Sequence, residues 1–133
     1  MAYYLDTSAF LKLVVAEAES RALRRWVAKS DADVYASELL RVEALRTARR
    51  HSEQALVEAR SRLAAVTLIA VTSNICERAA ELDPGILRSL DAVHLATALA
   101  AGDRLDGVIT YDRRLVDACA AHGVRVVSPG AAA

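Results

Sequence analysis

The sequence predicts an α/β fold, a helix-sheet-helix sandwich around a mostly parallel five-stranded sheet. Five short apolar runs, rich in β-branched or aromatic residues, alternate along the chain with longer segments of helical periodicity. Strands that alternate with helices pair in parallel through right-handed crossovers. The apolar runs also lack polar alternation, which is typical of strands covered on both faces.

The predicted elements follow one another without a long linker. The expected strands are residues 2–5, 33–36, 67–71, 107–110 and 124–127. The expected helices are residues 7–29, 37–64, 73–82, 91–101 and 113–121. We expect the second helix to break near residues 51–53, where Ser52 can cap a new helix.

The length of the chain is that of one domain. It has 133 residues, 54% of them hydrophobic, which is enough to bury a core without disulfides. No internal repeat or low-complexity block appears in the sequence. We therefore expect a single domain over residues 1–128 and a flexible tail over residues 129–133.

Charge and cysteine content argue against several classes of protein. Seventeen Lys and Arg balance seventeen Asp and Glu, so the chain has no overall attraction to nucleic acid or to an anionic membrane. Cys76 and Cys119 have no metal-binding spacing, which argues against a zinc site or a disulfide framework. Asp6 and Lys12 interrupt the apolar start of the chain, so it does not look like a signal peptide or a membrane span. We expect a cytoplasmic protein.

Three aspartates are expected at the edge of the sheet where ligands bind. Asp6 directly follows the first strand, Asp112 follows the fourth, and Asp91 opens a helix. In open parallel sheets, ligands bind beyond the carboxyl ends of the strands, where the strand order reverses. Aspartate is also a favoured helix N-cap, an effect worth about 1 kcal/mol, so capping alone is the competing interpretation of each.

Glu43 is an acid among apolar neighbours. It shares a helix face with Leu40 and Ala44, at the spacing typical of a stripe that faces the core. Such a glutamate can also reach the rim of the helix or pair with an arginine, here Arg41 or Arg46. Only its combination with the aspartates favours a functional role.

Other polar residues do not indicate a site by themselves. His94 lies on the alanine-rich helix after Asp91, where a histidine is more often structural, and we assign it no role. Thr7 and Ser8 follow Asp6, but no hydrolase triad or G-x-S-x-G motif accompanies them.

Four segments carry a resemblance to a known family. They are YLDTSA (residues 4–9), SELLRVEA (residues 37–44), LDAVHLATA (residues 90–98) and ITYDRRL (residues 109–115). In this order and spacing, over essentially the whole chain, they resemble the PIN-domain ribonucleases. More closely, the chain is similar to VapC-type toxins of bacterial toxin–antitoxin pairs.

The resemblance implies a site and a function. Asp6 and Asp91 would be the principal ligands of Mg²⁺ or Mn²⁺, and Glu43 and Asp112 would complete the acidic cluster, directly or through water. Thr110 matches a position where the family often has a hydroxyl residue that supports the pocket. The implied activity is hydrolysis of RNA phosphodiester bonds, and the implied partners are an RNA substrate, a cognate antitoxin and a second copy of the chain.

Physical chemistry gives an independent reason for a cation at such a cluster. Two unit charges about 4 Å apart repel by roughly 4 kcal/mol at an effective dielectric constant near 20, so clustered carboxylates take up protons or cations. Oxygen ligands favour Mg²⁺ or Mn²⁺ over zinc. A divalent ion lowers the pKa of water and offsets the charge that develops on a phosphate.

Three other classes of protein also have acids at strand ends, and two of them need a residue that this sequence lacks. The main one is a non-catalytic binding module of the same fold, whose acidic pocket receives an arginine of a partner. A phosphatase of the haloacid dehalogenase kind needs D-x-D, and here Ser8 stands at the third position. A receiver domain needs a lysine near the last strands, and no lysine follows Lys29.

Overall fold

The chain folds around one parallel sheet. The computed structural model describes residues 2–31 and 33–131. The strands are β1 (Ala2–Leu5), β2 (Asp33–Ser37), β3 (Thr67–Ile69), β4 (Leu105–Ile109) and β5 (Val126–Val127). They form a five-stranded sheet in the order β3-β2-β1-β4-β5, and every pair of neighbours is parallel. The predicted α/β sandwich is confirmed.

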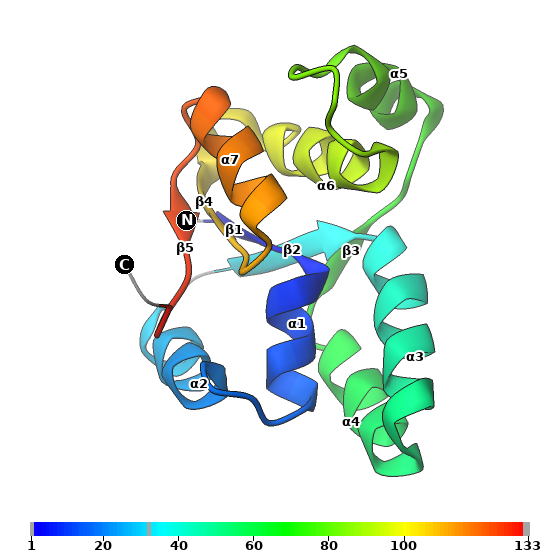
Figure 1. Cartoon of the computed structure of the whole chain (residues 1–133), viewed down its shortest axis with the longest axis vertical. Helices are drawn as coiled ribbons and strands as arrows, with labels where there is room; N and C mark the ends of the chain where they lie inside the picture. The colour runs from blue at the N-terminus through cyan, green and yellow to red at the C-terminus, as the bar shows by residue number, and fades with distance from the viewer. Residues whose placement is uncertain (1, 32, 132–133) are drawn as a thin grey trace.

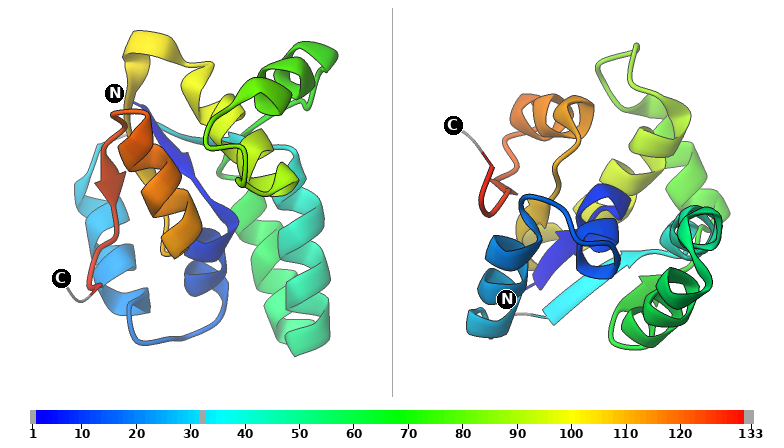
Figure 2. Two further views of the ribbon diagram at one scale, coloured as in Figure 1. Left: turned by 45° about the horizontal axis from the view of Figure 1, so that its top comes forward. Right: turned by 60° about the horizontal axis from the view of Figure 1, so that its bottom comes forward.

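Helices cover both faces of this sheet (Figure 1). They are α1 (Thr7–Val14), α2 (Ser20–Lys29), α3 (Leu39–His51), α4 (Glu53–Leu63), α5 (Ser73–Glu81), α6 (Ser89–Leu99) and α7 (Arg113–Ala121), and a 3-10 turn, η1 (Gly102–Arg104), precedes β4. One layer contains α1 to α4, which pack on one another, and the other contains α6 and α7, with α5 against α6 (Figure 2).

The central strand β1 shows how each face is filled. Its side chains alternate, so Tyr3 and Leu5 face the layer of α1 to α4, and Tyr4 faces α6. The ring of Tyr3 packs edge-on against Trp26 of α2, with 4.9 Å between ring centroids. Tyr4 packs edge-on against Tyr35 of β2 at 5.3 Å. Both faces of β1 are therefore buried, as the lack of polar alternation predicted.

Two expected helices differ in how they break. The expected helix 7–29 is in fact two helices, because Val15 is extended and the hydroxyl of Ser20 accepts the N–H of Glu17 at 2.9 Å. The prediction of one helix was wrong. The helical periodicity of the sequence continues across this turn and therefore does not indicate the break. The expected break near residues 51–53 is confirmed, since the Ser52 hydroxyl accepts the N–H of Ala55 and caps α4.

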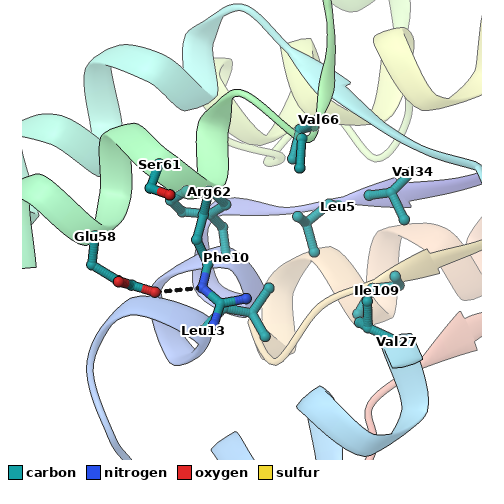
Figure 3. Close-up of a pocket in the computed structure, with 11 residues that line it drawn as sticks. Leu5, Phe10, Leu13, Val27, Val34, Glu58, Ser61, Arg62, Val66 and Ile109 are labelled. Atoms are coloured by element: carbon teal, nitrogen blue, oxygen red, sulfur yellow. Dashed lines mark hydrogen bonds and ion pairs between the residues drawn. The ribbon is translucent and has the colours of Figure 1, made fainter. Parts of the chain in front are cut away.

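An apolar cavity of about 400 Å³ lies between the sheet and the layer of α1, α2 and α4 (Figure 3). Leu5, Phe10 and Ile109 line its floor, and the ion pair between Glu58 and Arg62, 2.9 Å long, lies at its side. None of the four candidate acids lines this cavity. A site built from these acids therefore lies outside this cavity.

The end of the described chain lies against the domain. The hydroxyl of Tyr111 donates to the carbonyl of Pro129 at 2.7 Å. Gly130 has φ +80°, and a Cβ there would lie 2.7 Å from the Cβ of Ala22. Residues 132–133 of the expected tail lie outside the described residues. No helix within residues 2–31 and 33–131 is long and apolar enough to cross a membrane.

The two cysteines should differ sharply in reactivity. Cys76 is exposed, whereas Cys119 is fully buried, and burial followed by the charge of Asp6 raises the pKa of its thiol to about 12. We expect Ellman's reagent at pH 8 to modify one thiol per native chain and two after denaturation. A Cys76→Ser variant should show no fast-reacting thiol, and rapid labelling of that variant would contradict the burial of Cys119.

Candidate active site

The strand order reverses between β1 and β4, and two candidate residues lie at that point. β2 and β3 lie on one side of β1, and β4 and β5 lie on the other. The N–H of Asp6 donates to the carbonyl of Ile109 at 3.0 Å, which joins the ends of the two central strands. Asp6 and Thr110 therefore emerge side by side where open parallel sheets bind their ligands.

Asp6 is held by one of its two carboxylate oxygens. It is 5% exposed, and it caps the N-terminus of α1. Its Oδ2 accepts from the hydroxyls of Ser8 at 2.8 Å and Thr110 at 2.9 Å. No described residue donates a hydrogen bond to Oδ1, and no buried side-chain oxygen among the described residues lacks a partner, so Oδ1 is the oxygen that reaches solvent.

Thr110 connects Asp6 to Asp112. Its buried hydroxyl donates to Asp6 and accepts the N–H of Asp112 at 3.1 Å. Asp112 caps α7, where its Oδ1 accepts the N–H of Arg114 at 3.0 Å. The hydroxyl of Thr110 therefore links two of the candidate acids.

Ser8 is a residue that sequence reasoning missed. Its hydroxyl donates to Asp6 and accepts the N–H of Tyr111 at 2.9 Å, so it joins the β1 end to the β4 end. From the sequence alone, Ser8 is interpreted only as a candidate nucleophile and as the third position of a D-x-D motif. Its place two residues after an N-capping aspartate was the available signal, because that spacing lets a hydroxyl reach the carboxylate.

Glu43 faces inward from α3. Its Oε1 accepts from the Thr7 hydroxyl at 2.6 Å and from Nε2 of His94 at 2.8 Å. Burial raises the pKa of Glu43, but the hydrogen bonds from His94 and Thr7 lower it more, so the net shift is downward. The alternative of a pair with Arg41 does not occur, since Arg41 pairs with Glu38.

Asp91 does not cap its helix. Helix α6 begins at Ser89, after Arg88, so Asp91 is the third residue of the first turn and the expectation that it opens the helix was wrong by two residues. Burial raises the pKa of Asp91, and the charges of Asp112 and Asp6 raise it further. The negative charges of Asp112 and Asp6 therefore act on the Asp91 carboxylate.

His94 is in contact with the same cluster. It is 2% exposed, and its Nε2 lies 3.8 Å from Oδ1 of Asp6. Burial lowers the pKa of His94, but the hydrogen bond to Glu43 and the charges of Asp6, Glu43 and Asp91 outweigh it and raise the pKa overall. Hydrogen bonds through Thr7, His94 and Thr110 thus place Glu43 and Asp112 near Asp6. Asp91 lies near enough for its charge to act on His94.

The chemistry of these donors fits a hydrated Mg²⁺ or Mn²⁺ better than a closed metal cage. In residues 2–31 and 33–131, no three His, Cys, Asp or Glu side chains are arranged as ligands of one ion. Mg²⁺ usually takes one or two carboxylates and keeps several waters. Oδ1 of Asp6 and the carboxylate of Asp91 accept no hydrogen bond from a described residue, so they fit that pattern.

Comparison with known proteins agrees with this fold. The PIN-domain family model matches residues 3–121. Ribonuclease VapC46 of Mycobacterium tuberculosis is 41% identical over 128 residues, which cover 96% of this chain and 98% of that protein. Ribonuclease VapC47 of the same species is 37% identical over 132 residues, 96% of this chain and 97% of that protein.

Solved structures share the fold at lower identity. The toxin VapC20 of M. tuberculosis has a TM-score of 0.75 at 22% identity, over 96% of this chain and 99% of that one. A toxin–antitoxin complex from Klebsiella pneumoniae contains a chain with a TM-score of 0.73 at 23% identity, over 96% of this chain and 97% of that one. The fold and the family match together define a PIN domain.

The chain belongs to the PIN-domain family and, within it, to the VapC-type ribonucleases, the toxins of toxin–antitoxin systems. The family expected from the four sequence segments is thus confirmed.

Substitutions of Thr110 should show whether its hydroxyl stabilises the fold beyond the burial of the side chain. Thr110→Val leaves the Asp112 N–H without its acceptor and removes a donor from Asp6, so we expect unfolding to become easier by about 1–3 kcal/mol. Thr110→Ser keeps the hydroxyl and should lose less. Urea unfolding at neutral pH measures both.

Thr97→Val is the matched control for this substitution. Thr97 is equally buried, but its hydroxyl donates only to the Val93 carbonyl within α6. A Thr110→Val variant no less stable than Thr97→Val would contradict the bridging role of Thr110.

Proposed function

We propose that this chain hydrolyses RNA phosphodiester bonds at the acidic edge, with Mg²⁺ or Mn²⁺ held mainly by Asp6 and Asp91. Glu43 and Asp112 complete the site, directly or through water. The observation that carries the proposal is the geometry at the ends of β1 and β4, where Thr110 joins Asp6 to Asp112 and Thr7 and His94 hold Glu43 beside them. Burial, and then the charges of Asp112 and Asp6, raise the pKa of Asp91. Accumulated negative charge of this kind favours a divalent cation.

The residues of the site divide the work of holding this charge in place. Ser8 and Thr110 fix Oδ2 of Asp6, so Oδ1 is presented in one orientation. Asp91 contributes a second carboxylate from the first turn of α6. When bound, a divalent ion supplies an activated water and neutralises charge at the phosphate. Prior fixation of the ligands lowers the cost of reaching that arrangement.

The negative charge of this edge of the sheet opposes the binding of RNA. The acidic cluster repels a phosphodiester until a cation reverses the local charge. The arginines Arg41, Arg46, Arg49 and Arg50 are exposed on α3, the helix that also carries Glu43. We infer that they contact the phosphate backbone of the substrate, and that recognition depends more on backbone shape than on base stacking.

A cognate antitoxin is the protein partner that we propose. Two solved structures of the same fold are described as toxin–antitoxin complexes, the one from Klebsiella pneumoniae and VapBC2 from Rickettsia felis. An arginine of the antitoxin entering the acidic edge would pair with these carboxylates and compete with the cation. A non-catalytic module would show the same arginine binding but no RNA cleavage.

Loss of either principal carboxylate should remove the activity. We expect Asp6→Asn and Asp91→Asn each to lower the rate of Mg²⁺-dependent cleavage of a total-RNA substrate more than about 100-fold, while circular dichroism shows a folded chain. Asp103→Asn is the matched control, because Asp103 is exposed in η1, before the amino end of β4.

Removal of the cation tests the same proposal from the other side. EDTA should stop cleavage by the wild type, and added Mg²⁺ or Mn²⁺ should restore it. Undiminished cleavage by Asp6→Asn or by the EDTA-treated wild type would rule out the mechanism.

We also propose a homodimer. Ile86 is 93% exposed and Leu90 52%, and Leu90 adjoins Asp91. Sedimentation of the chain at micromolar concentration should show a dimer, and a variant with Ile86→Ser and Leu90→Ser together should shift toward the monomer. Val57→Ser, on α4 in the other helix layer, should remain dimeric. A monomeric wild type would contradict this proposal.

A further inference from the structure

The imidazole of His94 has a partner on each ring nitrogen. Nδ1 lies 2.6 Å from the hydroxyl of Tyr4, and Nε2 lies 2.8 Å from Oε1 of Glu43. Tyr4 is fully buried and His94 is 2% exposed, so protein groups, and not bulk solvent, satisfy these atoms. The N–H of Ser37 also lies 3.1 Å from the Tyr4 oxygen. Four groups from β2, β1, α6 and α3 thus form one continuous series of contacts.

The two ends of this series have a fixed direction. The Ser37 amide can only donate, so the Tyr4 oxygen accepts from it. The Glu43 carboxylate can only accept, so Nε2 of His94 carries the hydrogen between them. The Tyr4 hydroxyl and Nδ1 of His94 share the contact in the middle, at 2.6 Å.

An unprotonated Nε2 does not fit this series. With the proton on Nδ1 alone, the lone pair of Nε2 would face the negative charge of Glu43 at 2.8 Å. Two buried acceptors facing one another without a hydrogen carry a desolvation penalty.

We propose that Tyr4 and His94 are positioning residues for Glu43. A hydrogen-bond relay runs from the Ser37 N–H through the Tyr4 hydroxyl and His94 to Glu43, and it holds the imidazole with its Nε2–H toward the Glu43 carboxylate. The effect of this relay on the site rests on the proposed function. The relay itself is a property of the metal-free chain.

The relay fixes which oxygen of Glu43 remains available. Oε1 accepts from both His94 and Thr7, whereas Oε2 accepts from no described residue. The same Nε2–H lies 3.8 Å from Oδ1 of Asp6, so the polar edge of the imidazole stands between two carboxylates of the site. His94 therefore orients Glu43 and lessens its repulsion with Asp6.

Packing around Tyr4 makes the relay rigid. The Tyr4 ring packs edge-on against Tyr35 at 5.3 Å and against the His94 ring at 5.8 Å. The hydroxyl of Tyr35 donates to the carbonyl of Ala98 at 2.6 Å, which fixes α6 relative to β2. Tyr35 thus resembles Tyr4 in burial and packing, but it takes no part in the relay.

Nitrogen NMR of the metal-free protein tests the relay directly. The chain has three histidines, and a His94→Gln variant assigns the His94 signals by their loss. At neutral pH we expect a protonated nitrogen at Nε2, because it faces the Glu43 carboxylate. Tyr4→Phe should shift the Nδ1 signal, and Tyr35→Phe, the matched control, should leave it in place.

Calorimetric titration with Mn²⁺ measures the effect on the site. Loss of a partner that orients a metal ligand costs about 10- to 100-fold in affinity, so Tyr4→Phe should weaken Mn²⁺ binding by that factor and Tyr35→Phe should not. His94→Leu, which removes the donor to Glu43, should weaken binding in the same way. His94→Gln, which keeps an N–H donor, should recover most of it, and this pair also serves if Tyr4→Phe does not fold.

The results separate the relay from the proposed function. An unprotonated Nε2 in the wild type, or equal Mn²⁺ affinity of Tyr4→Phe and Tyr35→Phe, would overturn the positioning role. Equal affinity of His94→Leu and His94→Gln would do the same. A wild type that binds no Mn²⁺ and cleaves no RNA would refute the proposed function, while the nitrogen spectrum would still decide the relay.

Discussion

Carboxylates that share one edge of a sheet repel one another, and the rest of the site is organised around that repulsion. Two unit charges about 4 Å apart repel by roughly 4 kcal/mol at an effective dielectric constant near 20. The chain offsets part of it with hydroxyl and imidazole donors on Asp6 and Glu43. The pKa of Asp91, raised by burial, Asp112 and Asp6, shows that part remains. A site that keeps such an imbalance is suited to a cation from outside the chain.

Helix termini contribute to the same balance. Asp6 and Asp112 cap α1 and α7, and Asp91 lies in the first turn of α6. Each position places a negative charge near the positive end of a helix dipole, a gain of about 0.3–1 kcal/mol. Capping and function were competing interpretations of these aspartates in the sequence. In the structure Asp6 and Asp112 do cap their helices. This capping is compatible with the proposed metal binding, because the first turn after a strand is where a parallel sheet presents its ligand-facing edge.

Local patterns explain why most of the fold could be predicted. Alternation of apolar runs and helical segments sets the parallel topology, and a capping serine marked the start of α4. The break between α1 and α2 escaped prediction because its cause is the contact of Ser20 with Glu17, within a segment that keeps helical periodicity. Sequence spacing also placed Asp91 at the helix start, whereas the helix begins two residues earlier at Ser89.

The four acids and Thr110 could be proposed from the sequence, but Ser8, Tyr4 and His94 could not. Ser8, Tyr4 and His94 act through partners on other elements, and no periodicity within one element reports such a partner. His94 illustrates this: on its own helix it is one more buried side chain among alanines, and only the approach of β1 and α3 gives its two nitrogens distinct roles. Tyr4 belongs at once to the core and to this relay. Core packing and site geometry are therefore coupled in this fold, since a change that moves the Tyr4 ring also moves the group that orients Glu43.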